Sequence, residues 1–398
     1  MVGESHGGPQ DLQDTIAPVT LDSFFRRYWE REPLYGPARE GRSFTALFAP
    51  EDFEYLVCSA ALRYPALRVV KQHEHVDVGQ YTADLAWRPE SFTGVVDLTR
   101  LTALLAEGAT IVLQGLHYFW PPLSRYCRAL EADFGCGVQV NAYYTPASST
   151  GLPLHHDTHD VFVLQSRGRK TWRVFSPLVE LPLESQRYEP RLDPAGRESR
   201  ELTLEPSEFL YMPRGWLHQA RAQDEPSLHL TVGIRAYVWL EDLHAALEEC
   251  SDDVAFRRSV PMSGEAQEDL LARLQQRLTP TAVQRRRRLR AAAGQQSILP
   301  DQIRQEERLG SLGVNSEVCR RDDVVVELLD WEGDHLGVAF EGKTVVFPPQ
   351  AREALQFVLF GPRRFSPSML PGSLREAGRI VLVRRLIREG LLRLTVTS

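Results

Sequence analysis

The sequence is poor in cysteine, and none of its cysteines lie close together. The 398 residues include five cysteines and no CxxC pair. The scattered positions are Cys58, Cys127, Cys136, Cys250 and Cys319. An odd and widely spaced set argues against a disulfide framework and against a zinc ribbon. We therefore expect free thiols in a reducing cytoplasm.

Long apolar runs are also absent, and basic residues are not in excess. No stretch reaches the roughly 20 apolar residues that span a bilayer, and the first residues lack the basic and apolar pattern of a signal peptide. The 46 Lys+Arg and 53 Asp+Glu give a net charge of -7. This balance excludes a chain that binds nucleic acid through its overall charge. We expect a cytoplasmic protein with no membrane segment, in which nucleic-acid binding is unlikely outside a local basic patch.

The first half of the chain changes from a polar leader to a β-rich region. Residues 1–18 are expected to form a disordered leader. The segment Leu21–Ala38 predicts an amphipathic helix that ends at Pro33, because proline cannot continue the helical hydrogen bonds. From about Thr110 to Val238, short runs rich in β-branched and aromatic residues alternate with turn signals. This spacing is typical of an antiparallel sandwich or barrel.

The second half begins with helical patterns and ends with a mixed region. Apolar residues recur at helical spacing from about Leu240 to Ala293, and we interpret the run Arg285–Arg288 near the end as a solvated helix face or linker. From about Asp322, three short strands precede a helix, a second helix and a final strand, which suits a small winged-helix domain. The predicted domains are thus 19–238, 239–298 and 299–398.

The segment "GLPLHHDTHD" at 151–160 concentrates histidine and aspartate. In an extended strand, residues i and i+2 share a face, so His155 and Asp157 can face one ion while His156 points away. His218, which follows a turn in "EFLYMPRGWLHQA", offers a third ligand. Two histidines and one carboxylate form the facial triad that leaves open positions on Fe(II).

Two further features bear on this site. A second HxD pattern, "HEHVD" at 73–77, has no comparable partner histidine, and we interpret it as a solvated strand or loop. Lys170 lies 15 residues after His155, beyond the "SRGR" turn. It is either an exposed turn lysine or an ammonium that returns beside the metal strand to bind a carboxylate.

Longer motifs resemble a known family. "VQVNAYYTPASSTGLPLHHDTHDVFVLQSRGRKTWRVFSP" and "EFLYMPRGWLHQA" resemble the JmjC-type ribosomal oxygenases, which are cupin-like 2-oxoglutarate-dependent protein hydroxylases. "GATIVLQGLHYFWPP" and "YWEREPL" are also similar to family segments, so the resemblance spans roughly residues 20–240. It implies an α+β protein with a double-stranded β-helix (cupin/jelly-roll) core, followed by a helical dimerisation region and a C-terminal winged-helix domain.

The resemblance also assigns roles to residues. The implied metal ligands are His155, Asp157 and His218. The implied cosubstrate residues are Lys170, which would bind the distal carboxylate of 2-oxoglutarate, with Tyr143 and Asn141, which share one strand face. The candidate substrate-pocket residues are His229, Asp160 and Gly233. For His229, a substrate contact and a buried core histidine stay equally open, and Asp160 is also expected to support the ligands or lie at the surface together with His159.

The implied function is hydroxylation of an arginine or histidine side chain of a ribosomal protein or other peptide by a homodimeric enzyme that uses Fe(II), 2-oxoglutarate and O₂. "VGIRA" with Gly233 resembles the arginine-hydroxylating subgroup, whereas Lys170 resembles the histidine-hydroxylating subgroup, so both substrates stay open. Two alternatives remain. One is a hydroxylase of small molecules or modified peptides. The other is a non-catalytic regulator that binds nucleic acid through C-terminal arginines, among them Arg363, Arg364, Arg375, Arg379, Arg384, Arg385 and Arg388.

Overall fold

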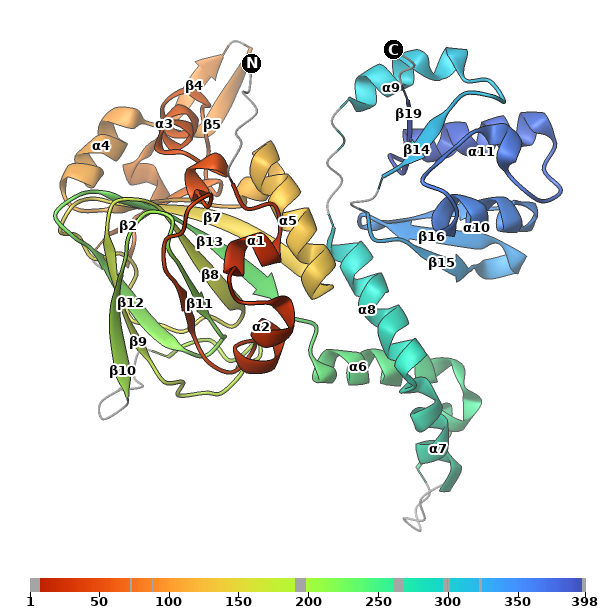
Figure 1. Ribbon diagram of the computed structural model, residues 1–398, viewed down its shortest axis with the longest axis horizontal. Coiled ribbons are helices and arrows are strands. Elements are labelled where there is room, and N and C mark those ends of the chain that lie inside the picture. The colour runs from red at the N-terminus through yellow and green to blue at the C-terminus, as the bar shows by residue number, and fades with distance from the viewer. Residues whose placement is uncertain are drawn as a thin grey trace. The chain divides into compact units, whose positions relative to one another are not determined.

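A computed structural model describes most of the chain as two compact units (Figure 1). The described residues are 8–71, 74–87, 89–189, 198–260, 268–295, 299, 301–321 and 324–395. The first unit comprises Met1–Phe134 and Val138–Ala236, and the second comprises Gly135–Gly137 and Tyr237–Ser398. Across the described ranges, no helix is both long and apolar enough to cross a membrane.

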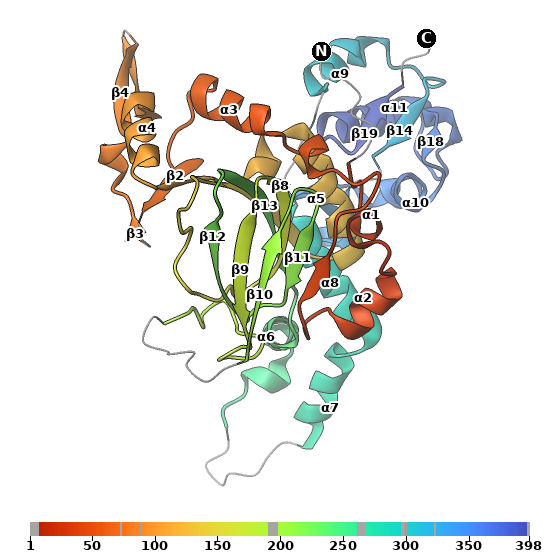
Figure 2. The same ribbon diagram turned by 60° about the vertical axis from the view of Figure 1, so that its left-hand side comes forward.

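Two antiparallel sheets form the centre of the first unit. The larger has the order β1-β11-β8-β13-β7-β6-β2-β3 and the smaller the order β10-β9-β12. The strands of the larger sheet are β1 (Leu34–Gly36), β2 (Leu67–Lys71), β3 (Glu74–His75), β6 (Thr110–Leu113), β7 (Gly137–Thr145), β8 (Asp160–Arg167), β11 (Phe209–Met212) and β13 (Ser227–Arg235). Those of the smaller are β9 (Lys170–Phe175), β10 (Ser199–Leu204) and β12 (Leu217–Ala222), which run side by side in Figure 2. The predicted β-rich sandwich or barrel is confirmed.

The side chains of strand β8 show what each face of the larger sheet contacts. Val161 and Val163 face a cavity shared with the smaller sheet, whereas Phe162 packs against Phe24 and Tyr211 on the other face, with ring centroids 5.7 and 4.9 Å apart. Because both faces are covered, the stretch Val161–Leu164 of this strand is continuously apolar and buried. Its alternate residues therefore line a cavity on one side and a helical cover on the other.

The helical cover includes two N-terminal helices. Their positions contradict two predictions, the extent of the disordered leader and the end of the helix at Pro33. Helix α1 (Leu12–Ile16) begins at the cap residue Asp11 and buries its apolar residues, so the predicted disordered leader ends before it; residues 1–7 lie outside the described ranges. Helix α2 (Leu21–Arg27) ends six residues before Pro33. The end of the predicted helical segment instead forms the edge strand β1 (Leu34–Gly36), which pairs with β11.

The segment before the β-rich region extends the larger sheet. It contains α3 (Pro50–Ser59), β2, β3, a hairpin of β4 (Thr82–Trp87) and β5 (Glu90–Val96), and α4 (Leu98–Ala106), followed by α5 (Pro121–Phe134). In the rival HxD pattern, Asp77 accepts a hydrogen bond from the Gly79 N–H at 2.9 Å, so it shapes a turn. His73 lies outside the described residues.

The second unit starts with the predicted helices, α6 (Trp239–Glu249), α7 (Glu268–Arg277) and α8 (Pro280–Gly294). The solvated-face interpretation of the arginine run is wrong for Arg286. Its guanidinium is buried and pairs with Asp242 at 2.8 Å. Arg288 pairs with Glu327, also at 2.8 Å. The run thus joins α8 to neighbouring elements of its own unit.

The last portion has a mixed core of two three-stranded sheets and helices. The sheets have the orders β18-β14-β19 and β15-β16-β17. Their strands are β14 (Val318–Arg320), β15 (Glu327–Asp330), β16 (Leu336–Phe340), β17 (Lys343–Phe347), β18 (Arg364–Phe365) and β19 (Leu392–Leu394), and the helices are α9 (Gln302–Arg308), α10 (Arg352–Phe360) and α11 (Glu376–Arg388). The predicted strand–helix order is confirmed, while the winged-helix assignment stays a prediction.

Candidate metal centre

Three side chains meet at one end of the cavity between the two sheets. His155 Nε2 lies 3.7 Å from one carboxylate oxygen of Asp157, and His218 Nε2 lies 3.7 Å from the other. Among the described residues, these three form the one group of His, Cys, Asp and Glu side chains that could hold a metal ion. The structure therefore brings together the three ligands expected from the sequence.

The backbone that carries them differs from the predicted strand. His155 and His218 exchange two hydrogen bonds, His155 N to His218 O at 3.2 Å and His218 N to His155 O at 2.8 Å. They form an isolated bridge, and the regular strand β8 starts only at Asp160. His156 is buried elsewhere, with its Nε2 3.1 Å from the Gln186 carbonyl oxygen. The i, i+2 relation therefore holds in an extended loop that is tied to β12.

Backbone carbonyl groups orient both ligand histidines. His155 Nδ1 lies 2.7 Å from Pro153 O, and His218 Nδ1 lies 3.0 Å from Trp216 O. A carbonyl oxygen can only accept, so each Nδ1 carries the proton and each Nε2 keeps its lone pair toward Asp157. This is the arrangement by which outer contacts set the tautomer of a metal-binding imidazole.

Charge and burial keep the donor set ready for a cation. Burial opposes ionisation of Asp157, but attraction by His155, His159 and His218 outweighs burial and lowers the pKa of the carboxyl group. Burial, followed by repulsion from His155, lowers the pKa of His218 to about 4. A neutral imidazole and an ionised carboxylate are the forms that bind metal.

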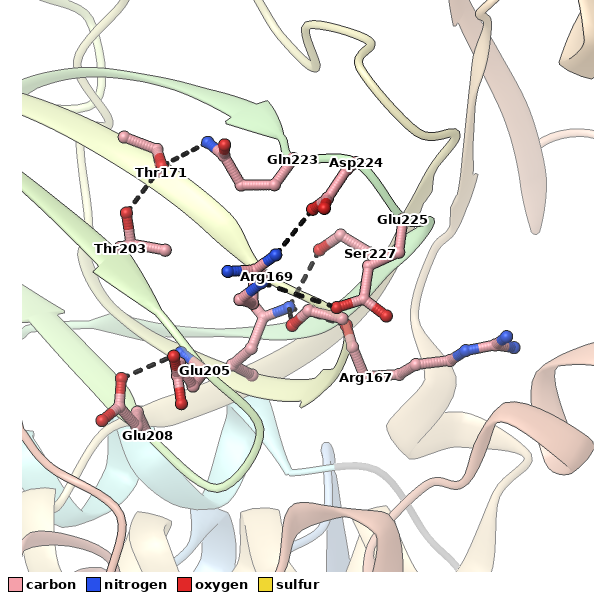
Figure 3. Close-up of polar contacts among 12 residues, drawn as sticks. Arg167, Arg169, Thr171, Thr203, Glu205, Glu208, Gln223, Asp224, Glu225 and Ser227 are labelled. Atoms are coloured by element: carbon pink, nitrogen blue, oxygen red, sulfur yellow. Dashed lines mark hydrogen bonds and ion pairs between the residues drawn. The ribbon is translucent and has the colours of Figure 1, made fainter.

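Lys170 enters the cavity from the first residue of β9, directly after a tight turn. Gly168 has φ +68°, and a Cβ there would lie 2.1 Å from Pro226 O, so the turn requires glycine. Figure 3 shows Arg169 of this turn reaching Asp224 and Glu225, at 2.7 and 3.7 Å. These contacts join the β8–β9 turn to the β12–β13 turn, and β9 leaves the turn with Lys170 pointing inward.

The Lys170 ammonium has one polar partner within the described residues. It donates to Thr145 Oγ1 at 2.9 Å, and the side chain is only 2% exposed. Burial lowers the pKa of Lys170 to about 7. Lys170 is therefore a buried cation without a carboxylate beside it, and the expectation of an exposed turn lysine is wrong.

The remaining candidates divide into two groups. Tyr143 and His229 stack at 5.1 Å between ring centroids, and both line the cavity together with Asn141. Asn141 also accepts a hydrogen bond from Gly115 N at 3.0 Å. Burial, followed by repulsion from Lys170, lowers the pKa of His229 well below its usual range. His229 is therefore a neutral residue of the cavity wall.

Asp160 and Gly233 do not line the cavity. Asp160 is fully buried on the opposite face of β8, where it accepts hydrogen bonds from Arg214 and Tyr211, each at 2.8 Å. Its direction follows from strand alternation, because Val161 is the neighbour that faces inward. At Gly233, a Cβ would lie 2.6 Å from Cδ2 of His159. The missing side chain makes room for the His159 ring, which does line the cavity.

Sequence reasoning missed two residues of the cavity wall and the hydrogen-bond partner of Lys170. Arg68 comes from β2, Thr145 from the end of β7 and Trp172 from β9. Arg68 and Trp172 line the cavity of about 360 Å³ together with the triad. Inward alternation after Lys170 could have indicated Trp172, but no local signal indicated Arg68, since its strand joins the sheet through a distant pairing with β6.

Residues 117–241 match the family model described as JmjC domain. This part of the chain is similar to JmjC domains. The domain and its flanks are 32% identical over 258 residues to Ribosomal oxygenase 1 of Rattus norvegicus, covering 62% of this chain and 41% of that protein. They are 32% identical over 266 residues to Ribosomal oxygenase 2 of the same organism, covering 63% and 54%. The chain thus spans about half the length of these curated relatives.

Solved structures resemble the chain over most of its length. The X-ray structure of Escherichia coli YcfD covers 95% of this chain and 98% of that one, with a TM-score of 0.54 and 15% identity. A YcfD complex with cobalt and 2-oxoglutarate matches with a TM-score of 0.51 at 15% identity, covering 94% of this chain and 98% of that one. At this identity the likeness concerns the fold. Together with the sequence relatives, it confirms the resemblance to the JmjC-type ribosomal oxygenases.

Proposed function

We propose that the chain is an Fe(II)- and 2-oxoglutarate-dependent oxygenase that hydroxylates an amino-acid side chain of a ribosomal protein. The observation that carries the proposal is the placement of the His155–Asp157–His218 triad and buried Lys170 in one cavity. A facial triad alone serves many reactions. An unpaired ammonium in the same cavity adds a site for a carboxylate, which 2-oxoglutarate would supply.

The residues of the cavity fit both Fe(II) and 2-oxoglutarate. Two imidazole Nε2 atoms and one carboxylate form the donor set typical of non-haem Fe(II) oxygenases. Fe(II) with 2-oxoglutarate and O₂ supplies the oxidative chemistry that inserts an oxygen atom into a C–H bond. Lys170 and Thr145 would hold the distal carboxylate by charge-assisted and neutral hydrogen bonds. The apolar walls, among them Val161, Val163 and Trp172, would exclude water around the reacting atoms.

The names of the relatives favour a ribosomal protein as the substrate. Those named ribosomal oxygenases match more than half of this chain, and a relative from Drosophila persimilis, 30% identical over 226 residues, is named a bifunctional lysine-specific demethylase and histidyl-hydroxylase. We propose an arginine or histidine side chain as the acceptor of the oxygen atom.

Succinate production with matched variants tests the proposal. Wild-type protein with Fe(II), 2-oxoglutarate and O₂ should release succinate, and ribosomal proteins should increase the rate. His155→Ala and Asp157→Ala should abolish turnover, whereas His156→Ala should retain most of it, because its ring bonds away from the triad. Wild-type protein that releases no succinate with any ribosomal fraction would reject the proposal. Melting temperatures of the three variants serve as the folding control.

We also propose that the helical region mediates a homodimer. Helix α6 exposes a stripe at positions i, i+4 and i+8, formed by Trp239, Leu243 and Leu247, which are 71%, 38% and 50% exposed. Such a stripe matches the seam by which two helices pack. Trp239→Glu should shift the protein toward monomer in sedimentation, whereas the same change at exposed Val260 should not. A monomeric wild-type protein would contradict the dimer.

The regulator alternative receives less support. In the portion 299–398, which we propose to be a winged-helix domain, several arginines already have intramolecular partners. Arg388 pairs with Glu306 at 2.6 Å and Arg385 with Glu389 at 2.8 Å, and Arg379 donates to backbone carbonyl groups. Arginines held in this way are poorly available to phosphate groups.

A further inference from the structure

Arg68 belongs to the wall of the same cavity as the triad. Strand pairing places Arg68 of β2 opposite Val112 of β6, and Val112 opposite Tyr143 of β7. Side chains of directly paired residues share a face of the sheet. Since Tyr143 faces the cavity, Arg68 does so too, and both are among its lining residues. Arg68 therefore reaches the triad cavity from β2, two strands away from Tyr143 on β7.

One N–H group of the Arg68 guanidinium lacks an acceptor. Its Nε–H is buried without a hydrogen-bond partner, and its Nη1 lies 3.2 Å from Nε2 of His75. Within the described part of the chain, no carboxylate lies within ion-pair distance of it. A buried donor without an acceptor destabilises the folded protein, and more so when the group is charged. A ligand that brings an acceptor into the cavity would remove this cost.

The charges of the cavity wall indicate which ligands fit. Among the described lining residues, the acid is Asp157, and the arginine and lysine side chains are Arg68 and Lys170. The charges of the proposed Fe(II) and 2-oxoglutarate cancel, and Asp157 is then bound to the metal. The wall then keeps a net positive charge, and no lining carboxylate remains to pair with a positively charged target side chain. Like charges brought together in a partly dehydrated site reject a ligand strongly.

Building on the proposed function, we propose that Arg68 is a specificity-determining residue that selects a neutral, hydrogen-bond-accepting target side chain. Its N–H groups would donate to an imidazole nitrogen or an amide oxygen of the target. A guanidinium or an ammonium group would enter without a counter-ion and next to a like charge. Of the two side chains left open by the sequence, histidine is therefore selected over arginine.

The first experiment identifies the modified residue. Ribosomes from cells that lack the gene are incubated with wild-type protein, Fe(II), 2-oxoglutarate and O₂, and tandem mass spectrometry locates each added oxygen atom. Oxygen on a neutral, acceptor-bearing side chain is the expected result. Oxygen on arginine or lysine overturns the inference while leaving the oxygenase function intact. Absence of succinate from the wild-type protein rejects the proposed function itself, and this inference with it.

The second experiment tests Arg68 with the peptide so identified. Manganese(II)-loaded protein binds the peptide without turning it over, so a dissociation constant gives a readout that does not depend on activity. Arg68→Gln should weaken binding about tenfold or more, which corresponds to about 1.4 kcal/mol, and Arg68→Lys should recover part of the loss. Arg63→Gln is the matched control, because this exposed arginine contacts Phe92 and does not line the cavity.

The steady-state constants separate a substrate role from a cosubstrate role. Arg68→Gln should raise the KM for the peptide by a larger factor than the KM for 2-oxoglutarate. The same peptide with arginine at the target position should bind wild-type protein at least about tenfold more weakly. Equal affinity of both peptides, or a raised KM for 2-oxoglutarate alone, would overturn the assignment.

Discussion

Replacing Lys170 by methionine should stabilise the ligand-free protein, and the gain should depend on pH. Burial lowers the pKa of Lys170 from 10.5 to about 7. At about 1.36 kcal/mol for each pKa unit, this difference corresponds to roughly 5 kcal/mol. It is an upper limit on the cost of keeping the ammonium buried without a counter-ion. Methionine has similar length, carries no charge and occupies the same volume.

The sign of the pH dependence follows from proton binding. Because the pKa of Lys170 is lower in the folded protein, the unfolded chain binds more protons between about pH 7 and pH 10.5. The stability of the wild-type protein therefore rises with pH through this range. The advantage of Lys170→Met should fall from roughly 5 kcal/mol below about pH 7 to roughly 2 kcal/mol at about pH 9. The lost hydrogen bond to Thr145 subtracts about 1 kcal/mol at every pH.

Urea unfolding of both proteins at about pH 6 and about pH 9 measures this change. Lys71→Met is the control, because Lys71 is partly exposed and pairs with Glu107 at the surface; it should cost no more than about 1 kcal/mol at either pH. A gain for Lys170→Met that is equal at both pH values, or a loss at both, would refute the reasoning. The same variant should lose 2-oxoglutarate turnover, because the carboxylate partner is gone.

Three further outcomes are expected. Gly233→Ser should displace His159, since a Cβ at this position would lie 2.6 Å from the ring; the substrate KM and a crystal structure check this against Gly137→Ser, which meets nothing within 4 Å. Asp160→Ala should destabilise the protein by about 3 kcal/mol, because it removes a buried partner of Arg214; urea unfolding measures the loss, and a loss below about 1 kcal/mol would contradict it. Manganese(II) should raise the melting temperature of wild-type protein but not of a triad variant, because an ion that binds only the folded state stabilises it.

The grouping of the three candidate ligands could be predicted from the sequence because their relation is local. His155 and Asp157 are two residues apart, and an extended backbone gives them one face whether it is a regular strand or a loop. The position of His218 followed from a turn and a strand start, both of which have sequence signals. The segment with His155 and Asp157 is a loop with an isolated bridge and not the expected strand, yet the two side chains share a face as expected, because the bridge keeps the segment extended.

Other parts of the site depend on distant pairings, which no local pattern reveals. Arg68 faces the cavity because β2 joins β6, which lies more than 40 residues further along the chain. Gly233 resembled a substrate-pocket position, but its role depends on a ring from the ligand loop. The first helix was taken for part of a disordered leader, because the surface that buries Leu12 and Ile16 is built by later elements. Composition alone cannot show such burial.

Lys170 and Arg68, the lysine and arginine of the cavity wall, share one property. Neither Lys170 nor Arg68 has a carboxylate partner among the described residues, so each adds an electrostatic cost to the empty protein. If Lys170 and Arg68 served only the stability of the fold, an apolar residue at either position would stabilise the protein more. Under the two proposals, both costs would be offset when the ligands supply acceptors, a dicarboxylate at Lys170 and a neutral side chain at Arg68. Cosubstrate and substrate should therefore stabilise the protein together, by about 2.7 kcal/mol for each ligand at 100 times its Kd.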